Sequence, residues 1–172
     1  MSVKTILTEP NKLLRQISKS VEKIGDEERT LMDDMLDTMY DAPGIGLAAI
    51  QIGVPKRIIV MDISKEENKK EPRYFVNPVI TKKNKDKAKY EEGCLSVPDQ
   101  FAEIERPNAC EVEYLDYDGK KQILKADGLL ATCIQHEMDH LEGILFIDYL
   151  SKLKRSMIIK KLSKNKVNRE IF

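Results

Sequence analysis

The segment His136-Glu137-Met138-Asp139-His140 contains both histidines of this 172-residue chain. Its HExxH spacing places two imidazoles one turn apart on one face of an α-helix, with a glutamate between them. Imidazoles arranged in this way can bind one metal ion, and the glutamate can accept a proton from an attacking water. The segment therefore predicts a catalytic metal site that needs a third ligand from elsewhere in the chain.

The helix that carries this segment is expected to form the centre of the fold. Asp127 can cap its beginning and Gly143 can stop it, so the helix should cover about residues 127–142. Apolar side chains leave few of its faces free for solvent, which predicts a buried helix. These apolar residues are Leu129, Leu130, Ile134, Met138 and Leu141.

The rest of the chain predicts two more helices and several antiparallel strands. Amphipathic patterns predict helices over residues 26–42, with a methionine-rich core face, and over 150–163. Asp118-Gly119 predicts a tight hairpin turn, and the charged segments 64–72 and 82–89 predict loops or hairpin ends. The expected strands, some with the alternation of a sheet with one wet face, cover 57–63, 74–81, 90–97, 109–115 and 121–125.

The composition predicts one globular domain over residues 1–172. Hydrophobic residues make up 41% of the chain and charged residues 34%, and no apolar run is long enough to span a bilayer. The first residues contain no signal-peptide core, and three cysteines do not resemble a secreted disulfide framework. We therefore expect a cytoplasmic protein with no membrane partner.

The net charge of zero hides a basic C-terminal segment. Residues 151–172 contain eight Lys or Arg and one acidic residue, whereas the preceding 150 residues contain 21 basic and 28 acidic residues. The helix expected over 150–163 should pack its apolar face on the body and expose its lysines. Its lysine face suggests a contact with ribosomal RNA, which would depend on salt. We expect no DNA partner.

Several residues could supply the third metal ligand. The extended motif HExxHxxGxxH fails, because Phe146 stands where its last histidine should be. The acidic residues after His140 are either too near in sequence to fold back or belong to the basic terminus. Cys133 lies about 10 Å along the helix from His140, which is too far for short bonds to a shared ion. Cys133 is therefore expected to be a packing residue.

Two other cysteines remain as candidates. Cys110 alternates within an expected strand, as a core residue would. Cys94 follows Gly93 within EEGCLSVP at 91–98, where a constrained backbone can present its sulfur. We favour Cys94 as the third ligand, with a buried thiol as the alternative.

Three segments of the chain together resemble the peptide deformylase family. They are GIGLAAIQ at 44–51, EGCLS at 92–96 and QHEMDHLEG at 135–143. Flanking segments extend the resemblance over nearly the whole chain. It implies an α+β fold in which antiparallel sheets wrap around the central HExxH helix, followed here by a C-terminal amphipathic helix. It also implies a hydrolase that removes the N-formyl group from the formyl-methionine of new polypeptides and releases formate.

The resemblance implies a metal site and a proton carrier. Cys94, His136 and His140 are the implied ligands, and Glu137 is the implied catalytic acid and base. The implied cofactor is one divalent ion, Fe²⁺ in the native enzyme, with Zn²⁺, Ni²⁺ or Co²⁺ also accepted. With two neutral imidazoles and one thiolate as ligands, such an ion would keep a net positive charge and would remain a Lewis acid.

The resemblance also implies how the formyl-methionine peptide is bound. The Gln51 amide and the backbone N–H of Leu95 are the implied donors to the oxyanion. The glycines near residue 45 allow an extended peptide to pair with the backbone there. The expected substrate-binding residues are Ile45, Gly46, Gly93, Leu129 and Cys133, with His136 as a further wall of the methionine pocket.

Some residues around the site carry separate expectations. Glu92 and Arg106 are predicted to pair and to orient a ligand histidine. Phe101 stands where family members often have an arginine, which leaves the substrate contacts there open. Thr132 replaces a common aliphatic residue, and this change is expected to alter the pocket slightly.

Two other functions fit parts of the pattern. A metallopeptidase that cleaves internal peptide bonds also uses HExxH. A structural metal within a ribosome-binding module would fit the basic terminus. However, a closed structural site uses four protein ligands and has no need of Glu137.

Overall fold

The computed structural model describes residues 2–66 and 68–171, with side chains described to Lys164. The helices are α1 (Asp26–Asp41), α2 (Gly128–Leu141) and α3 (Lys152–Ile171), with 3-10 turns at Lys12–Arg15, Ala49–Ile52 and Phe146–Tyr149. The strands are β1 (Gly46–Ala48), β2 (Ile58–Met61), β3 (Arg73–Lys83), β4 (Lys87–Cys94), β5 (Val97–Pro107), β6 (Ala109–Leu115) and β7 (Lys121–Asp127).

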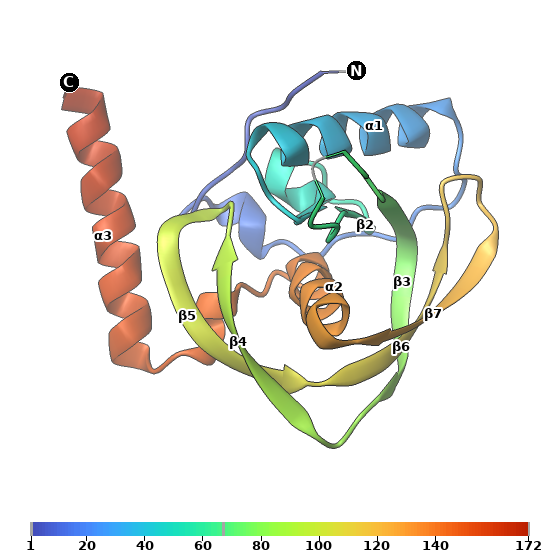
Figure 1. Ribbon diagram of the computed structural model, residues 1–172. Coiled ribbons are helices and arrows are strands. Elements are labelled where there is room, and N and C mark those ends of the chain that lie inside the picture. The colour runs from blue at the N-terminus through green and yellow to red at the C-terminus, as the bar shows by residue number, and fades with distance from the viewer. Residues whose placement is uncertain (1, 67, 172) are drawn as a thin grey trace.

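Two antiparallel sheets surround the central helix. One sheet has five strands in the order β1-β2-β3-β6-β7, and the other is the β4–β5 hairpin. Figure 1 shows α2 in the middle, with the hairpin on one side and the large sheet on the other. This arrangement confirms the α+β fold with sheets wrapped around the HExxH helix.

Helix α2 is buried because its apolar side chains fill the concave side of the large sheet. Ala131, Ile134 and Leu141 have no exposed surface, and they belong to one apolar cluster with Phe75 and Val112 of the sheet. Gly143, at φ +73, follows the helix as its expected stop. The helix therefore presents its histidines from the interior of the domain.

Helix α1 packs through its methionines, as expected. Met32, Met35 and Met39 are fully buried in a second apolar cluster that includes Leu47 and Ile58 of the sheet. These flexible thioether side chains fill the irregular space between the helix and the strands. The methionine stripe is thus part of the core.

The prediction of one strand over residues 90–97 is wrong at its C-terminal end. Strand β4 stops at Cys94, the chain turns, and β5 begins at Val97 and pairs back along the whole hairpin. Strand β5 was not expected, because Pro98 and Asp99, at φ +63, interrupt the usual strand pattern. Strand β1 was also not expected, because three small or apolar residues carry no periodic signal.

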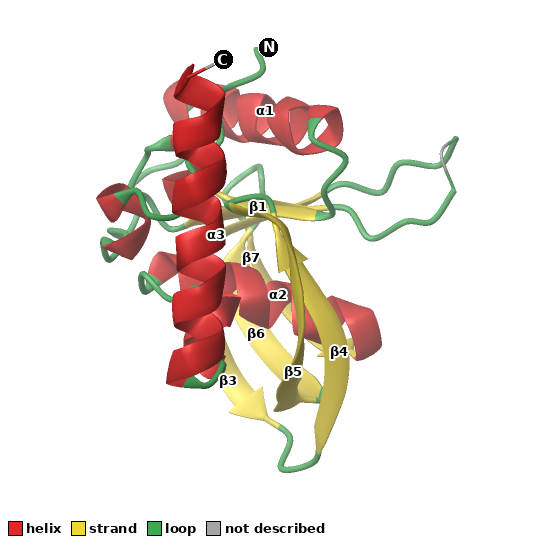
Figure 2. Cartoon of the chain, turned by 90° about the vertical axis from the view of Figure 1, so that its left-hand side faces the viewer, coloured by secondary structure: helices red, strands yellow, loops and turns green. Residues whose placement is uncertain are grey.

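The C-terminal helix is longer than the expected 150–163. Helix α3 lies along the β4–β5 side of the molecule in Figures 1 and 2. Ile158 and Leu162 attach it to an apolar cluster that contains Ile104 of β5 and Phe146. Within residues 2–66 and 68–171, no helix is both long enough and apolar enough to cross a membrane.

The close approach at Gly143 leads to a stability prediction. An added Cβ at Gly143 would lie 2.4 Å from the carbonyl oxygen of Arg15, and its φ also strains any L side chain. The backbone strain alone costs roughly 1–2 kcal/mol, and the collision adds to it. We expect Gly143→Ala to lower the Tm of the metal-loaded protein by more than about 5 °C.

A matched control separates the strain from the collision. Gly119 has a similar φ of +83, but an added Cβ there would lie no closer than 3.8 Å to another residue. Gly119→Ala should therefore lower the Tm less than Gly143→Ala does. Equal shifts in a thermal melt followed by circular dichroism would contradict the role given to the Arg15 contact.

Candidate metal centre and active site

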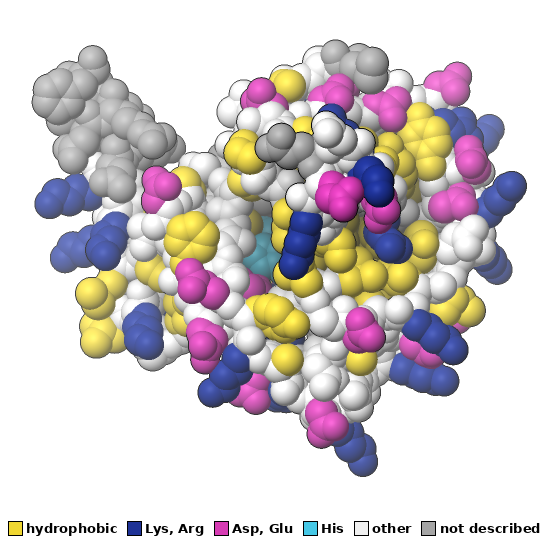
Figure 3. Space-filling view, viewed as in Figure 1, with side chains coloured by type: hydrophobic (Ala, Val, Ile, Leu, Met, Phe, Trp, Pro, Cys, Tyr) yellow, Lys and Arg dark blue, Asp and Glu magenta, His cyan; other side chains and the backbone are white. Residues whose placement is uncertain are grey.

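A cavity of about 470 Å³ opens between β1, the β4–β5 hairpin and α2. In Figure 3 it is the hollow near the middle of the face, where a histidine side chain is visible at depth. Three segments that are far apart in the sequence form its walls: residues 43–51, 90–101 and 129–137. The three motifs of the sequence therefore meet at one place.

Cys94, His136 and His140 come together at the inner end of this cavity. Their ligand atoms all lie within 4.8 Å of one another, and the Cys94 Sγ is 3.3 Å from the His140 Nε2. Ligand bonds of roughly 2.0–2.3 Å in a tetrahedral site also place ligand atoms a few Å apart. One sulfur and two imidazole nitrogens therefore fit a divalent metal ion in both spacing and chemistry.

Glu92 contacts one of these imidazoles, that of His136, through its Nδ1. The His136 Nδ1 lies 2.8 Å from the Glu92 Oε1, and Arg106 donates to both oxygens of Glu92 at 2.7 and 3.0 Å. Burial alone raises the pKa of Glu92, but the hydrogen bonds from His136 and Arg106 outweigh it and lower the pKa. An anionic Glu92 accepts the Nδ1 proton, which leaves the Nε2 of His136 free to bind metal.

Arg106 also ties the hairpin to the helix. Its Nη1 donates to the Asp139 Oδ2 at 2.8 Å, and the Tyr149 hydroxyl donates to the same oxygen at 2.7 Å. The guanidinium carbon lies 4.9 Å from the centre of the Tyr149 ring. Arg106 thus links β5, α2 and the turn before α3.

Glu137 lies beside the cluster at similar distances from both imidazoles. Its Oε1 is 3.8 Å from the His136 Nε2 and 3.9 Å from the His140 Nε2, and the residue is only 2% exposed. Burial raises the pKa of Glu137 to about 7; His136 opposes this increase and Glu92 adds to it. A carboxyl group with this pKa can hold or release a proton near neutral pH.

Gly46 lets strand β1 approach Glu137 closely. An added Cβ at this glycine would lie 3.0 Å from the carboxyl carbon of Glu137. Any side chain at residue 46 would therefore press on the carboxylate. This contact explains the second glycine of the GIGLAAIQ motif, Gly46.

The Gln51 side chain is fixed with its amide nitrogen toward the cluster. Its Oε1 accepts the N–H of Ala48 at 2.9 Å, which directs the Nε2 to the Ser96 Oγ at 3.0 Å and the Cys94 Sγ at 3.6 Å. The residue is 1% exposed, so it is not a solvent-facing loop amide. An N–H donor is thus held beside the cysteine.

Leu95 directly follows the cysteine in the turn between β4 and β5. Its side chain covers Gly44, where an added Cβ would lie 2.6 Å from the Leu95 Cδ1. This packing joins the turn to the segment before β1. The backbone N–H of Leu95 therefore belongs to a packed turn directly after Cys94.

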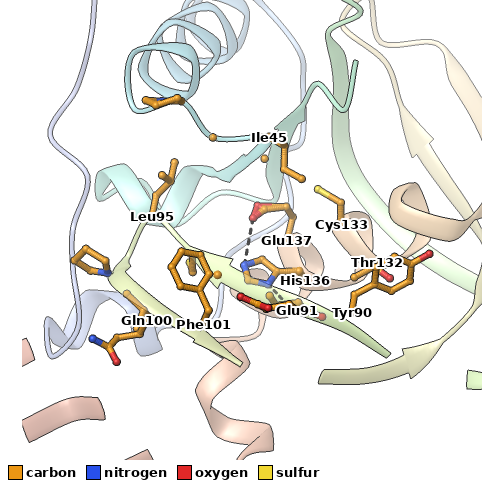
Figure 4. Close-up of a pocket in the computed structure, with 18 of the residues that line it drawn as sticks. Ile45, Tyr90, Glu91, Leu95, Gln100, Phe101, Thr132, Cys133, His136 and Glu137 are labelled. Carbon is orange, nitrogen blue, oxygen red and sulfur yellow. Dashed lines mark hydrogen bonds and ion pairs between the residues drawn. The ribbon is translucent and has the colours of Figure 1, made fainter. Parts of the chain in front are cut away.

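All five expected substrate-binding residues line the cavity. Ile45 and Leu129 lie at its partly exposed rim, and Cys133 is buried in its wall. The sequence analysis missed Tyr90, which also lines it (Figure 4). Because alternate strand residues share a face, Tyr90 could have been found from its position two residues before Glu92.

The rejected ligand candidates have other contacts. Glu142 pairs with Arg57 at 2.8 Å, and Asp148 pairs with Arg15 at 2.6 Å. The Phe146 ring stacks on His136 with 6.1 Å between ring centres, so it packs behind a ligand candidate. None of these residues belongs to the cluster in the described part of the chain.

Comparisons with known proteins show which family the chain belongs to. A sequence model of the polypeptide deformylase family matches residues 3–156. A peptide deformylase of Pelagibacter ubique is 86% identical over 171 residues, which cover 99% of both chains. The crystal structure of a peptide deformylase from Ehrlichia chaffeensis is 45% identical, with a TM-score of 0.91 and coverage of 96% of this chain and 97% of that chain.

A second Ehrlichia chaffeensis structure, in complex with actinonin, is 48% identical with a TM-score of 0.90, and the match covers 96% of this chain and 98% of that chain. These similarities extend over nearly the full length of the chain. The chain therefore belongs to the polypeptide deformylase family of metal-dependent hydrolases, which remove the N-formyl group from nascent polypeptides.

Proposed function

We propose that Cys94, His136 and His140 hold the metal ion that this family requires, and that the native ion is Fe²⁺. A thiolate with two imidazoles also accepts Zn²⁺, Ni²⁺ or Co²⁺, so availability contributes to the choice. The bound ion supplies a Lewis acid for the formyl group and for the attacking water. The contact of Glu92 with the Nδ1 of His136 would leave the Nε2 of this imidazole free to hold the ion.

We propose Glu137 as the proton carrier of the reaction. Its Oε1 accepts a proton from the attacking water and later delivers it to the departing amine. The observation that supports this role best is its similar distance from both imidazoles, 3.8 and 3.9 Å. A carboxylate at this position would lie next to an ion held by both imidazoles, which supports catalysis over a purely structural metal site.

We propose that Gln51 and Leu95 stabilise the negative charge on the formyl oxygen. The Gln51 Nε2 lies 3.6 Å from the Cys94 Sγ, and Leu95 directly follows Cys94 at the end of β4. Rigid donors of this kind lose little energy to reorganisation when the charge develops. Each such donor is typically worth about 2.7–4 kcal/mol of barrier.

We propose that the substrate lies along the free edge of β1. Strand β1 is the outermost strand of its sheet, so Ile45 and Gly46 can pair with an extended peptide. The methionine side chain then reaches the wall formed by Leu129 and Cys133, while Gly93 borders the opposite side. The reaction of the family, removal of the N-formyl group, favours this function over the cleavage of internal peptide bonds.

We further propose that residues 1–172 act as one catalytic domain in the cytoplasm, where polypeptides are made, and that α3 contacts the ribosome. The apolar residues Ile158 and Leu162 attach α3 to the body, and the lysines among its residues with described side chains are exposed. Exposed lysines along a helix suit contact with RNA phosphates.

Replacement of Glu137 by glutamine tests the catalytic proposal. The amide keeps the size of the side chain but cannot carry the proton, so we expect kcat for formate release from formyl-Met-Ala-Ser to fall by roughly 10²–10⁴. Metal content should stay at one ion per chain. Glu142→Gln is the control, since this carboxylate pairs with Arg57 outside the cavity. A kcat within a few-fold of wild type for Glu137→Gln would contradict the proposal.

The ligand assignment is tested with the three cysteines. Protein loaded anaerobically with Co²⁺ should show thiolate-to-cobalt absorption, and Cys94→Ala should lose this band together with most of its bound metal. Cys133→Ala and Cys110→Ala should keep both, because neither thiol belongs to the cluster. Loss of the band in Cys133→Ala instead would refute the assignment of Cys94.

The ribosome contact is tested by reversing charge on α3. Four exposed lysines are changed to glutamate: Lys152, Lys154, Lys160 and Lys161. We expect ribosome affinity at low salt to fall at least about tenfold and its salt dependence to weaken. The control carries the same charge change in the turn between β3 and β4 and on strands β4 and β7, at Lys85, Lys87, Lys121 and Lys125. An equal loss of ribosome affinity in both variants would contradict the contact through α3, because it would show that binding depends on net charge alone.

A further inference from the structure

A short segment near the start of the chain joins two of the three sequence motifs. The backbone N–H of Leu7 donates to the carbonyl oxygen of Gln51 at 2.7 Å. Two residues later, the N–H of Glu9 donates to the carbonyl oxygen of Ser96 at 2.8 Å. Gln51 ends the GIGLAAIQ motif and Ser96 ends the EGCLS motif. Residues 7–9 therefore connect the two segments that carry the proposed oxyanion donors.

The side chain of Arg15 extends this connection to the third motif. Its Nη1 donates at 3.2 Å to the carbonyl oxygen of Gly143, the last residue of the QHEMDHLEG motif, and at 2.6 Å to the Asp148 Oδ2. Its Nη2 lies 3.5 Å from the Glu9 Oε1. We call residues 7–15 the N-terminal brace, because they contact the last residue of each motif.

Arg15 supplies a cation to the buried carboxylate of Glu9. Glu9 is only 8% exposed, and its Oε2 has no hydrogen-bond partner among the described residues. A buried carboxylate without a cation is strongly unfavourable, so removal of Arg15 would drive the Glu9 side chain toward water. Because the backbone N–H of Glu9 holds Ser96, such a movement would displace the turn that follows Cys94.

The side chains of Gln51 and Ser96 repeat the connection closer to the metal centre. The Gln51 Nε2 donates to the Ser96 Oγ at 3.0 Å and lies 3.6 Å from the Cys94 Sγ. The amide nitrogen has two N–H groups, so one can bond to Ser96 while the other remains for the formyl oxygen. Neither residue is more than 1% exposed, and close packing transmits a displacement of one to the other.

We propose that Glu9 and Arg15 are positioning residues for the reaction, which hold the Gln51 amide where the oxyanion forms. The inference rests on the role proposed for Gln51. Neither positioning residue lines the cavity in the described part of the chain, so both act through Ser96. Oxyanion donors are effective only if they are in place before the charge develops. Loss of the brace should therefore lower kcat more than it raises KM.

The test is a double-mutant cycle that combines Arg15→Ala with Gln51→Ala. Formate release from formyl-Met-Ala-Ser gives kcat and KM for proteins of equal metal content. In the wild-type background, we expect Arg15→Ala to lower kcat about tenfold or more and to change KM less than about threefold. In the Gln51→Ala background it should lower kcat less than about twofold, because the donor that the brace positions is already absent.

Two further variants separate positioning from stability. Arg15→Lys keeps the charge beside Glu9 but not the planar fork, so it should show the same dependence on Gln51 with a smaller loss of kcat. This variant carries the cycle if the alanine variant does not fold. Arg57→Ala is the matched control, since Arg57 is also partly buried and pairs with Glu142 of the third motif at 2.8 Å but lies outside the brace. Its kcat should stay within about twofold of each background.

A second readout follows the Gln51 side chain without turnover. In isotope-labelled protein loaded with Zn²⁺, heteronuclear NMR identifies the side-chain amide signals of Gln51 by their absence from Gln51→Ala. We expect Arg15→Ala and Arg15→Lys to shift these signals and to speed their exchange with solvent. Arg57→Ala should leave them unchanged.

Two results would overturn the positioning role. One is an equal fold-loss of kcat from the Arg15 variants in both backgrounds, which would mean that the brace only stabilises the fold. The other is a set of Gln51 amide signals that the Arg15 variants leave unmoved. An unchanged kcat in Gln51→Ala itself would instead refute the oxyanion role of Gln51, and the NMR signals would then still show whether the brace holds this side chain.

Discussion

The burial of two imidazoles and a carboxylate on α2 is the constraint on which the rest of the structure depends. Histidine and glutamate side chains lose their hydration in the interior, at a cost of several kcal/mol for each group that stays charged without a partner. His140 has no exposed surface, and burial, with help from His136 and Arg106, lowers its pKa well below the usual value. A neutral imidazole is the form that binds metal, so burial prepares this ligand.

The β4–β5 hairpin completes what the helix begins. Glu92 and Cys94 are two residues apart on β4, and both reach the imidazoles of α2. One strand therefore provides a metal ligand candidate and the carboxylate that orients another. Arg106, from the paired strand, neutralises Glu92 and also binds Asp139 on the helix. The ion pairs thus hold the hairpin and the helix in a fixed relation, which a three-ligand site requires.

The sequence predicted the parts of this structure that depend on local spacing. The HExxH helix, its stop at Gly143 and the methionine stripe of α1 follow from periodicity and glycine. The choice of Cys94 followed from excluding other ligands. Strands β1 and β5 could not be predicted in this way, because β1 exists only by pairing with β2, and Asp99 at φ +63 lies inside β5. Missing β5 hid its pairing with β4 along the hairpin, which places Phe101 opposite Gly93.

Strand β1 connects substrate binding to catalysis through one contact. Gly46 lies at the free edge where the peptide is proposed to pair, and its Cα side faces the Glu137 carboxyl group. A peptide that pairs with this edge therefore has its backbone positioned relative to the proposed base as well as to the metal. Correct placement of reacting groups contributes several kcal/mol to catalysis. The glycine at residue 46 thus allows one strand to align the substrate and to support the carboxylate that transfers its proton.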